Sequence, residues 1–143
     1  MPTGQRNDPY MSYRFAIEIN GIIKGFAEAS GLQAEVQTED FREGGLNEFP
    51  HKIIKGSTYQ NITLKRGLTN GDELWRWHRD VIRGKVERKN LSIVLLDHQG
   101  NETWRWNFEQ VFPTKWTGPD LKAEGSNIAF ETLEFVHHGF EKV

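Results

Sequence analysis

The 143-residue sequence contains no cysteine, which excludes disulfide bonds and thiolate metal sites. It has no apolar run near the roughly 18 residues that a membrane-spanning helix needs. The N-terminal stretch MPTGQRNDPY also lacks the apolar region of a secretory signal. We therefore expect a protein that is synthesised in the cytoplasm and has no stable membrane anchor. If it leaves its cell, we expect release by lysis or within a larger assembly.

Neither sign of charge is in excess, since 18 Lys and Arg residues stand against 20 Asp and Glu residues, a formal net charge of -2. This balance gives no electrostatic reason to expect nucleic acid or an anionic membrane as a partner.

Sequence motifs of catalysis are also missing. No GxSxG, GxGxxG or GxxxxGK[ST] pattern occurs, which leaves nucleophile-elbow, dinucleotide and phosphate-loop sites without support. The five histidines include no HExxH, and the adjacent His137 and His138 would point to opposite faces of a strand. We predict no enzyme activity, no catalytic residue, no cofactor and no metal.

What the sequence does have is a strong period-two alternation, typical of strands with one buried face. The first example places Tyr13, Phe15, Ile17 and Ile19 on one side, and it ends at Asn20-Gly21, a typical hairpin turn. Further strands are predicted over 22–29, 32–36, 62–64, 91–96, 103–109 and 127–140. In the 103–109 strand, Trp104, Trp106 and Phe108 are expected to point inward. In the last one the apolar parity changes between Phe130 and Leu133, which predicts a bulge or a switch of faces.

One helix is predicted over 71–83. Its apolar face would comprise Leu74, Trp77, His78, Val81 and Ile82. Asn70 and Glu73 have the spacing of a capping box, and Gly84 is a suitable C-terminal stop. Seven or eight strands with one helix predict a mainly β domain, a two-sheet β-sandwich or barrel with one flanking α-helix. We expect residues 1–10 to form a flexible N-terminal arm and 11–143 to form the domain.

Two tryptophans, Trp75 and Trp116, are not assigned to the core by periodicity. If they are exposed, they would suit a protein interface or a sugar-binding platform.

The segment DFREGGLNEFPHKIIKG, residues 40–56, fits neither a short turn nor a core strand. Connections of this length are usually functional or disordered, and its apolar content is higher than a disordered linker needs. Open sheet edges are templates for pairing with another chain, and a long flanking hairpin could reach across such an edge. The residues thus favour a self-assembling β-domain over an enzyme.

Several short motifs, in order and spacing, resemble the tail tube family of contractile phages and phage-like contractile injection systems. They are YRF at 13–15, EING at 18–21, SGL at 30–32, FREG at 41–44, ITLKRG at 62–67, LWRWHRD at 74–80, WNF at 106–108, FPTKW at 112–116, NIA at 127–129 and ETLE at 131–134. The resemblance extends from about residue 9 to the C-terminus. One departure is the end of the long segment, where the family often has a Lys-x-Pro-Gly-like sequence and this chain has KIIKG at 52–56.

This resemblance implies a fold similar to the type VI secretion tube protein, and a structural inner-tube subunit without catalysis. Six subunits would close into a ring, and rings would stack into a hollow tube inside a contractile sheath. The implied partners are further copies of the chain, the sheath protein, baseplate and tube-cap proteins, and cargo or DNA in the lumen. The particle would be a phage tail or a phage-tail-like assembly.

In the family, the segment that matches 39–56 is an extended loop or hairpin that contacts neighbouring subunits and the adjacent ring. The resemblance therefore implies a subunit interface formed by Phe41, Arg42, Glu43, Leu46, Asn47, Phe49, Lys52, Ile53, Ile54 and Lys55. Two alternatives remain open, a tube-initiator paralogue at the baseplate and a monomeric carbohydrate-binding β-sandwich.

Overall fold

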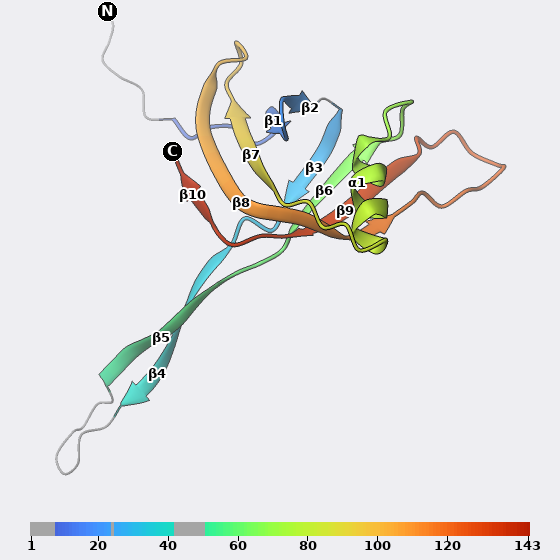
Figure 1. The fold of residues 1–143 in the computed structure, drawn as a ribbon. Helices are drawn as coiled ribbons and strands as arrows, with labels where there is room; N and C mark the ends of the chain where they lie inside the picture. Colours follow the sequence, from blue (N-terminus) through green and yellow to red (C-terminus); the bar gives the residue numbers. More distant parts are fainter. Residues whose placement is uncertain (1–7, 24, 42–50) are drawn as a thin grey trace, which may run out of the picture.

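The computed structural model describes residues 8–23, 25–41 and 51–143 and has two parts, a barrel-like body and a two-stranded ribbon that projects from it (Figure 1). These residues contain ten strands and one helix. Their bounds are β1 Phe15–Glu18, β2 Ile22–Ile23, β3 Phe26–Ser30, β4 Ala34–Phe41, β5 His51–Tyr59, β6 Ile62–Gly67, α1 Glu73–Ile82, β7 Lys89–Leu96, β8 Glu102–Thr117, β9 Phe130–Val136 and β10 Phe140–Lys142.

Eight strands form one continuous sheet in the order β2-β1-β7-β8-β9-β6-β3, with β10 also paired to β8. The body has two layers, and the 16-residue β8 belongs to both of them. Its first part pairs with β7 and β10, and its second part pairs with β9. It bulges near Gln110, which has a φ of 56°, and Figure 1 shows its strong curvature. The mainly β prediction, a sandwich or barrel with one flanking helix, is confirmed.

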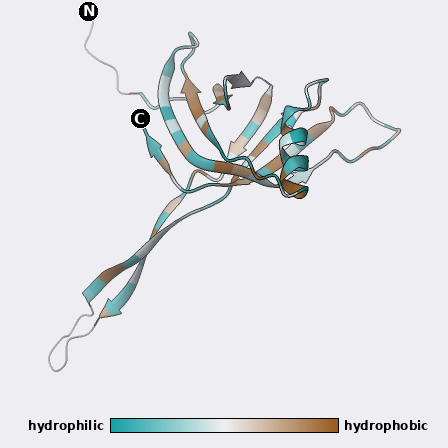
Figure 2. Cartoon of the chain, in the orientation of Figure 1, coloured by the Kyte–Doolittle hydropathy of each residue, from teal (hydrophilic) through white to brown (hydrophobic). Residues whose placement is uncertain are grey.

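The core is built from alternate residues of the body strands and from one face of α1. Figure 2 shows the hydrophobic residues spread along the body strands, between hydrophilic ones. The buried cluster comprises Ile17, Ile19, Ile62, Leu64, Leu74, Trp77, Leu91, Ile93, Phe108, Val111, Leu133 and Phe135. Side chains from both layers and the helix thus share one core, as packed layers require.

The helix packs on the body with Leu74, Trp77 and His78 buried, as predicted. Ile82 was wrongly placed on that face, since it is 66% exposed at the last turn. The predicted capping box is also wrong, because the N-cap residue is Asp72, without a side-chain cap. The Glu73 carboxylate instead accepts a hydrogen bond from the guanidinium of Arg66.

The parity change in the last predicted strand has a different cause from the one expected. The pairing of β6 with β9 runs without a register shift, and Glu131 occupies a core-facing position with 2% exposure. Its Oε1 lies 3.1 Å from Nη2 of Arg66, which is buried as well. A buried ion pair, and not a bulge in this strand, therefore replaces the apolar residue that the alternation predicted.

The predicted strand over 22–29 is two strands with different partners. β2 pairs with β1, whereas β3 pairs with β6 in the opposite layer. Gly25 lies between them with a φ of 92°, a conformation that suits glycine. The predicted turn is confirmed, since Asn20 and Gly21 have φ values of 55° and 123°.

Two aromatic residues expected to point into the core are exposed. Tyr13 precedes β1, and its hydroxyl lies 2.5 Å from Nδ1 of His98. Trp104 lies near the start of β8 and is 38% exposed, with its ring 5.6 Å from that of Trp106 and 4.8 Å from the ammonium of Lys142. The predicted alternation of side-chain directions is correct in β8, but the core does not extend to this end of the strand.

Candidate assembly interface

The ribbon formed by β4 and β5, called the arm below, extends away from the body as a separate two-stranded sheet (Figure 1). The register runs from Ala34 opposite Tyr59 to Phe41 opposite His51. The predicted strand over 32–36 was expected to have one wet face, but in the arm both faces of β4 are exposed. An isolated two-stranded hairpin is at best marginally stable in water, so the arm is a candidate for contacts beyond its own chain.

Both faces of the arm carry apolar side chains. Directly opposed residues share a face, so Ile54 lies with Thr38 on one side and Ile53 with Glu39 on the other. Ile54 is 76% exposed and Ile53 is 40% exposed. Phe41 is 47% exposed and lies on the same side as Ile53. Exposed apolar surface on both sides of a thin ribbon fits a segment placed between two other surfaces.

The KIIKG stretch that departs from the family pattern is an irregular part of β5. Gln37 pairs with Gly56, but the next residue, Thr38, pairs with Ile54, which leaves Lys55 as an extra residue. Such a bulge increases the local twist of a ribbon. The KIIKG stretch therefore forms a β-bulge inside the arm.

The charged residues of the arm interact with each other. Nζ of Lys52 lies 2.5 Å from Oδ1 of Asp40, and both side chains are more than half exposed. An exposed pair of this kind contributes little to stability, about 0 to 1 kcal/mol. It does fix the position of a charge beside Ile54 on the same face of the ribbon.

The arm joins the body through a narrow neck formed by 31–33 and 60–61. Gly31 has a φ of 95°, and a Cβ at this position would lie 2.2 Å from the carbonyl oxygen of Asn61. The backbone N–H of Gln60 donates to the carbonyl of Gln33 at 3.2 Å. The two segments approach so closely that only glycine fits at position 31.

Of the ten residues predicted for the interface, five lie in the arm: Phe41, Lys52, Ile53, Ile54 and Lys55. The other five, Arg42, Glu43, Leu46, Asn47 and Phe49, lie outside the described residues. The prediction omitted Val36 and Tyr59, which are also exposed apolar residues of the arm. Their signal was present in the sequence, but the alternation around Val36 was interpreted as a half-buried strand.

The tryptophans proposed for a sugar platform contact each other. The rings of Trp75 and Trp116 are 5.0 Å apart in an edge-to-face arrangement. Gly118 lies against the Trp116 ring, so that an added Cβ would be 2.9 Å from it. Trp75 is 37% exposed. Part of the ring surface that a sugar would need is therefore already used within the chain.

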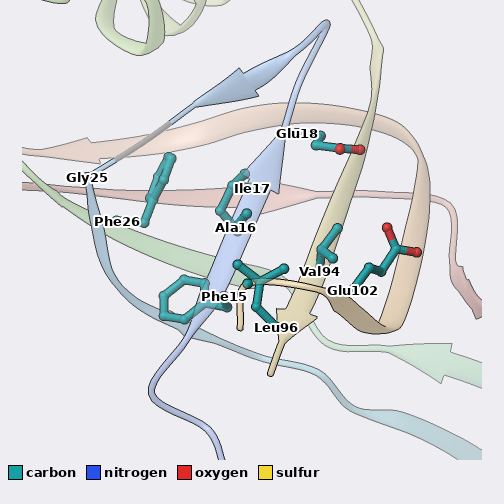
Figure 3. Close-up of a pocket in the computed structure, with 10 residues that line it drawn as sticks. Phe15, Ala16, Ile17, Glu18, Gly25, Phe26, Val94, Leu96 and Glu102 are labelled. Carbon is teal, nitrogen blue, oxygen red and sulfur yellow. The ribbon is translucent and has the colours of Figure 1, made fainter. Parts of the chain in front are cut away.

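A mostly apolar pocket of about 410 Å³ lies beside β1 and β7, where Phe15 and Phe26 form part of its wall (Figure 3). Its ionisable lining residues are Glu18 and Glu102, and the guanidinium of Arg105 binds both carboxylates. Arg105 lowers the pKa of Glu102 from its ordinary value. The pocket thus offers two anchored carboxylates and apolar walls, without a nucleophile or a free base among the described residues that line it.

In the described part of the chain, no group of three or more His, Cys, Asp or Glu residues is arranged to hold a metal ion. The same residues include no helix with the length and apolar character to cross a membrane.

Solved structures of similar fold include chains of a contractile injection system and of the anti-feeding prophage. A chain of the sheath-tube complex of the extracellular contractile injection system PVC, in its extended state, is 28% identical, with a TM-score of 0.86 over 96% of this chain and 93% of that one. A chain of the anti-feeding prophage (AFP) cap is 26% identical, with a TM-score of 0.88 over 99% and 95% of the two chains. Hcp1 from Flavobacterium johnsoniae, at 16% identity and a TM-score of 0.61 over 90% and 93%, shares the fold.

No match was found among curated protein sequences. The model of the T4-like virus tail tube protein gp19 family matches residues 11–141, nearly the whole chain. The chain therefore belongs to the T4-like virus tail tube protein family.

Proposed function

We propose that this chain is the inner-tube subunit of a contractile tail or contractile injection system, closing into hexameric rings that stack into a hollow tube inside a sheath. The observation that carries the proposal is the arm, which exposes apolar side chains on both faces and, beyond Tyr59 at its root, has no partner surface among the described residues of its own chain. Family membership and the likeness to chains of sheath-tube and cap complexes support it.

In this proposal the role is structural and not enzymatic. The pocket beside β1 has its carboxylates bound to Arg105, and the described residues bring together no group that could hold a metal. Further copies of the chain, the sheath, the baseplate and the cap are the proposed partners, with cargo or DNA in the lumen. Residues 11–143 form the tube domain, preceded by an N-terminal segment.

The arm supplies the contacts between subunits. Burial of an exposed Ile or Phe side chain contributes about 1.5 to 3 kcal/mol, and Phe41, Ile53 and Ile54 would each be buried once per subunit. Because the contact repeats around a ring, its effect on assembly is multiplied. Lys52 and Lys55, with Arg42 and Glu43, would form polar contacts at the rim that fix the register between subunits. Leu46, Asn47 and Phe49 would extend the same contact surface.

Electron microscopy of the purified protein tests the proposal. We expect rings with sixfold class averages that stack into tubes, with a yield that rises steeply with protein concentration. Single rings that never stack would favour the tube-initiator alternative. Dispersed monomers that bind glycan would favour the carbohydrate-binding alternative and would overturn the proposal.

A further inference from the structure

His137 lies at the neck of the arm, one residue after the end of β9. Its Nε2 is 2.9 Å from the carbonyl oxygen of Gln60, the first residue after β5. Its Nδ1 accepts a hydrogen bond of 3.0 Å from the backbone N–H of Gly139. Since Nδ1 is an acceptor, the neutral ring carries its proton on Nε2 and donates it to Gln60. One side chain thus links the root of the arm to the turn between β9 and β10.

The same ring joins an arm residue to the core by packing. His137 stands edge-to-face on the fully buried Phe108, with ring centroids 5.0 Å apart. The same ring also contacts Tyr59, the last residue of β5, with ring centroids 5.9 Å apart. Gly139, with a φ of 118°, approaches Tyr59 so closely that an added Cβ would be 3.0 Å from its ring. The turn that contains Gly139 therefore packs closely against Tyr59, which also contacts His137.

We propose that His137 is the positioning residue that fixes the direction in which the arm leaves the body. The backbone hydrogen bond between Gln60 and Gln33 closes the neck but joins only the two segments of the arm to each other. The bond from His137 to Gln60 joins the arm to the body. A two-stranded ribbon has no core of its own to hold its direction, so this bond, together with the edge-to-face packing of Tyr59 on Phe140 at 5.3 Å, holds the arm in one orientation.

The functional advantage of a fixed arm direction rests on the proposed function. A pre-oriented arm enters a subunit contact without the loss of conformational entropy that a swinging arm would incur. The positioning itself is a property of the single chain, and it can be measured without any assembly.

The absence of cysteine allows spin labels to be placed at chosen positions. Gln37→Cys places one label on the exposed surface of β4, and Lys115→Cys places the second on exposed β8 in the body. Pulsed electron paramagnetic resonance then gives the distribution of distances between arm and body. The sample is kept at a concentration at which the chain sediments as a monomer.

The test variant is His137→Asn in this doubly labelled chain. The Asn side-chain oxygen still accepts from the N–H two residues later, so the turn at Gly139 is kept. The shorter side chain no longer reaches Gln60. We expect a broader distance distribution. The population ratio of the observed arm orientation to all other orientations should fall about fivefold, the factor expected from the loss of one hydrogen bond. His138→Ala is the matched control, because His138 is exposed, contacts Arg88 at 3.3 Å and should leave the distribution narrow.

If His137→Asn does not fold, the same distance measurement is made on His137→Phe. This variant keeps an aromatic ring in contact with Phe108 and Tyr59 but loses both hydrogen bonds. A distribution as narrow as that of the parent chain in a folded variant would overturn the inference. Broadening without any loss of tube formation would support the positioning role and would show that assembly does not depend on the fixed direction.

Discussion

In β6 the side chains of Ile62 and Leu64 are fully buried, whereas in the preceding β5 those of Ile53 and Ile54 lie in solvent. The difference is one of surroundings and not of composition. β6 is paired on both edges, by β3 and β9, and packs in the core, while β5 is paired with β4 alone among the described strands. Apolar residues in the body therefore stabilise the single chain, and those of the arm are available to stabilise an assembly.

This contrast predicts that substitutions in the body change the free energy of unfolding, and that substitutions in the arm change assembly.

The largest effect is expected for Trp77→Ala. Trp77 is 5% exposed, and its Nε1–H donates to the carbonyl of Glu87 at 2.8 Å. Removal of this side chain should lower the free energy of unfolding by about 3 to 5 kcal/mol, measured by denaturant titration. Trp75→Ala is the control, since Trp75 is partly exposed, and it should cost clearly less. Equal losses in the two variants would show that the helix does not pack as described.

The next effect concerns the junction between the two regions. Gly31→Ala introduces a Cβ 2.2 Å from the backbone of Asn61 at a φ of 95°. The free energy of unfolding should fall by about 1 to 3 kcal/mol. Gly21→Ala is a matched control, because its φ is also positive but nothing lies within 4 Å of the added atom. A smaller loss in Gly31→Ala than in Gly21→Ala would contradict the close approach at the neck.

A smaller, pH-dependent effect is expected from Glu73. The Arg66 guanidinium lowers the pKa of Glu73 below its ordinary value. Because the pKa is lower in the folded chain, this contact stabilises the fold above the unfolded-state pKa and is lost as pH falls through the folded value. The stability difference between the wild type and Glu73→Gln should therefore be largest near neutral pH and shrink in acid. A difference that is constant with pH would argue against the contact.

The smallest effect on the monomer is expected for Ile54→Asp. Ile54 is largely exposed, so the free energy of unfolding should change by no more than about 0.5 kcal/mol. Tube formation, followed by sedimentation and negative-stain images, should be lost because a charge would enter an apolar contact. Ile82→Asp makes the same change at an exposed isoleucine of α1 and should leave tubes intact. Tubes of normal length in Ile54→Asp would remove this residue from the interface.

Much of the body was predictable because its alternation and its turns are local signals. The helix, the Asn20-Gly21 turn and the buried face of β6 follow from residue spacing alone. The buried Glu131 was not predictable in this way, since its partner Arg66 lies 65 residues away in the sequence. A charged residue in a core position can be explained only when the strand pairing, and with it the partner residue, is known.

The arm could be identified as unusual from its sequence, but its geometry could not be obtained. Period-two alternation around Val36 is the same whether the opposite layer belongs to the chain or to another molecule. The sequence also gave no sign that Lys55 forms a bulge or that His137 contacts Gln60. These features depend on pairing register and on a contact between distant segments.

The central claim is that the arm is dispensable for folding and required for assembly. The most direct measurement replaces 39–53 with a two-glycine turn, which keeps the pair Thr38 and Ile54 at the new end of the ribbon. Circular dichroism, sedimentation and negative-stain images are then compared with those of the full chain. We predict that the variant keeps its β spectrum and its melting temperature but sediments as a monomer at every concentration at which the wild type forms tubes. A variant that still builds tubes, or one that unfolds outright, would contradict the account.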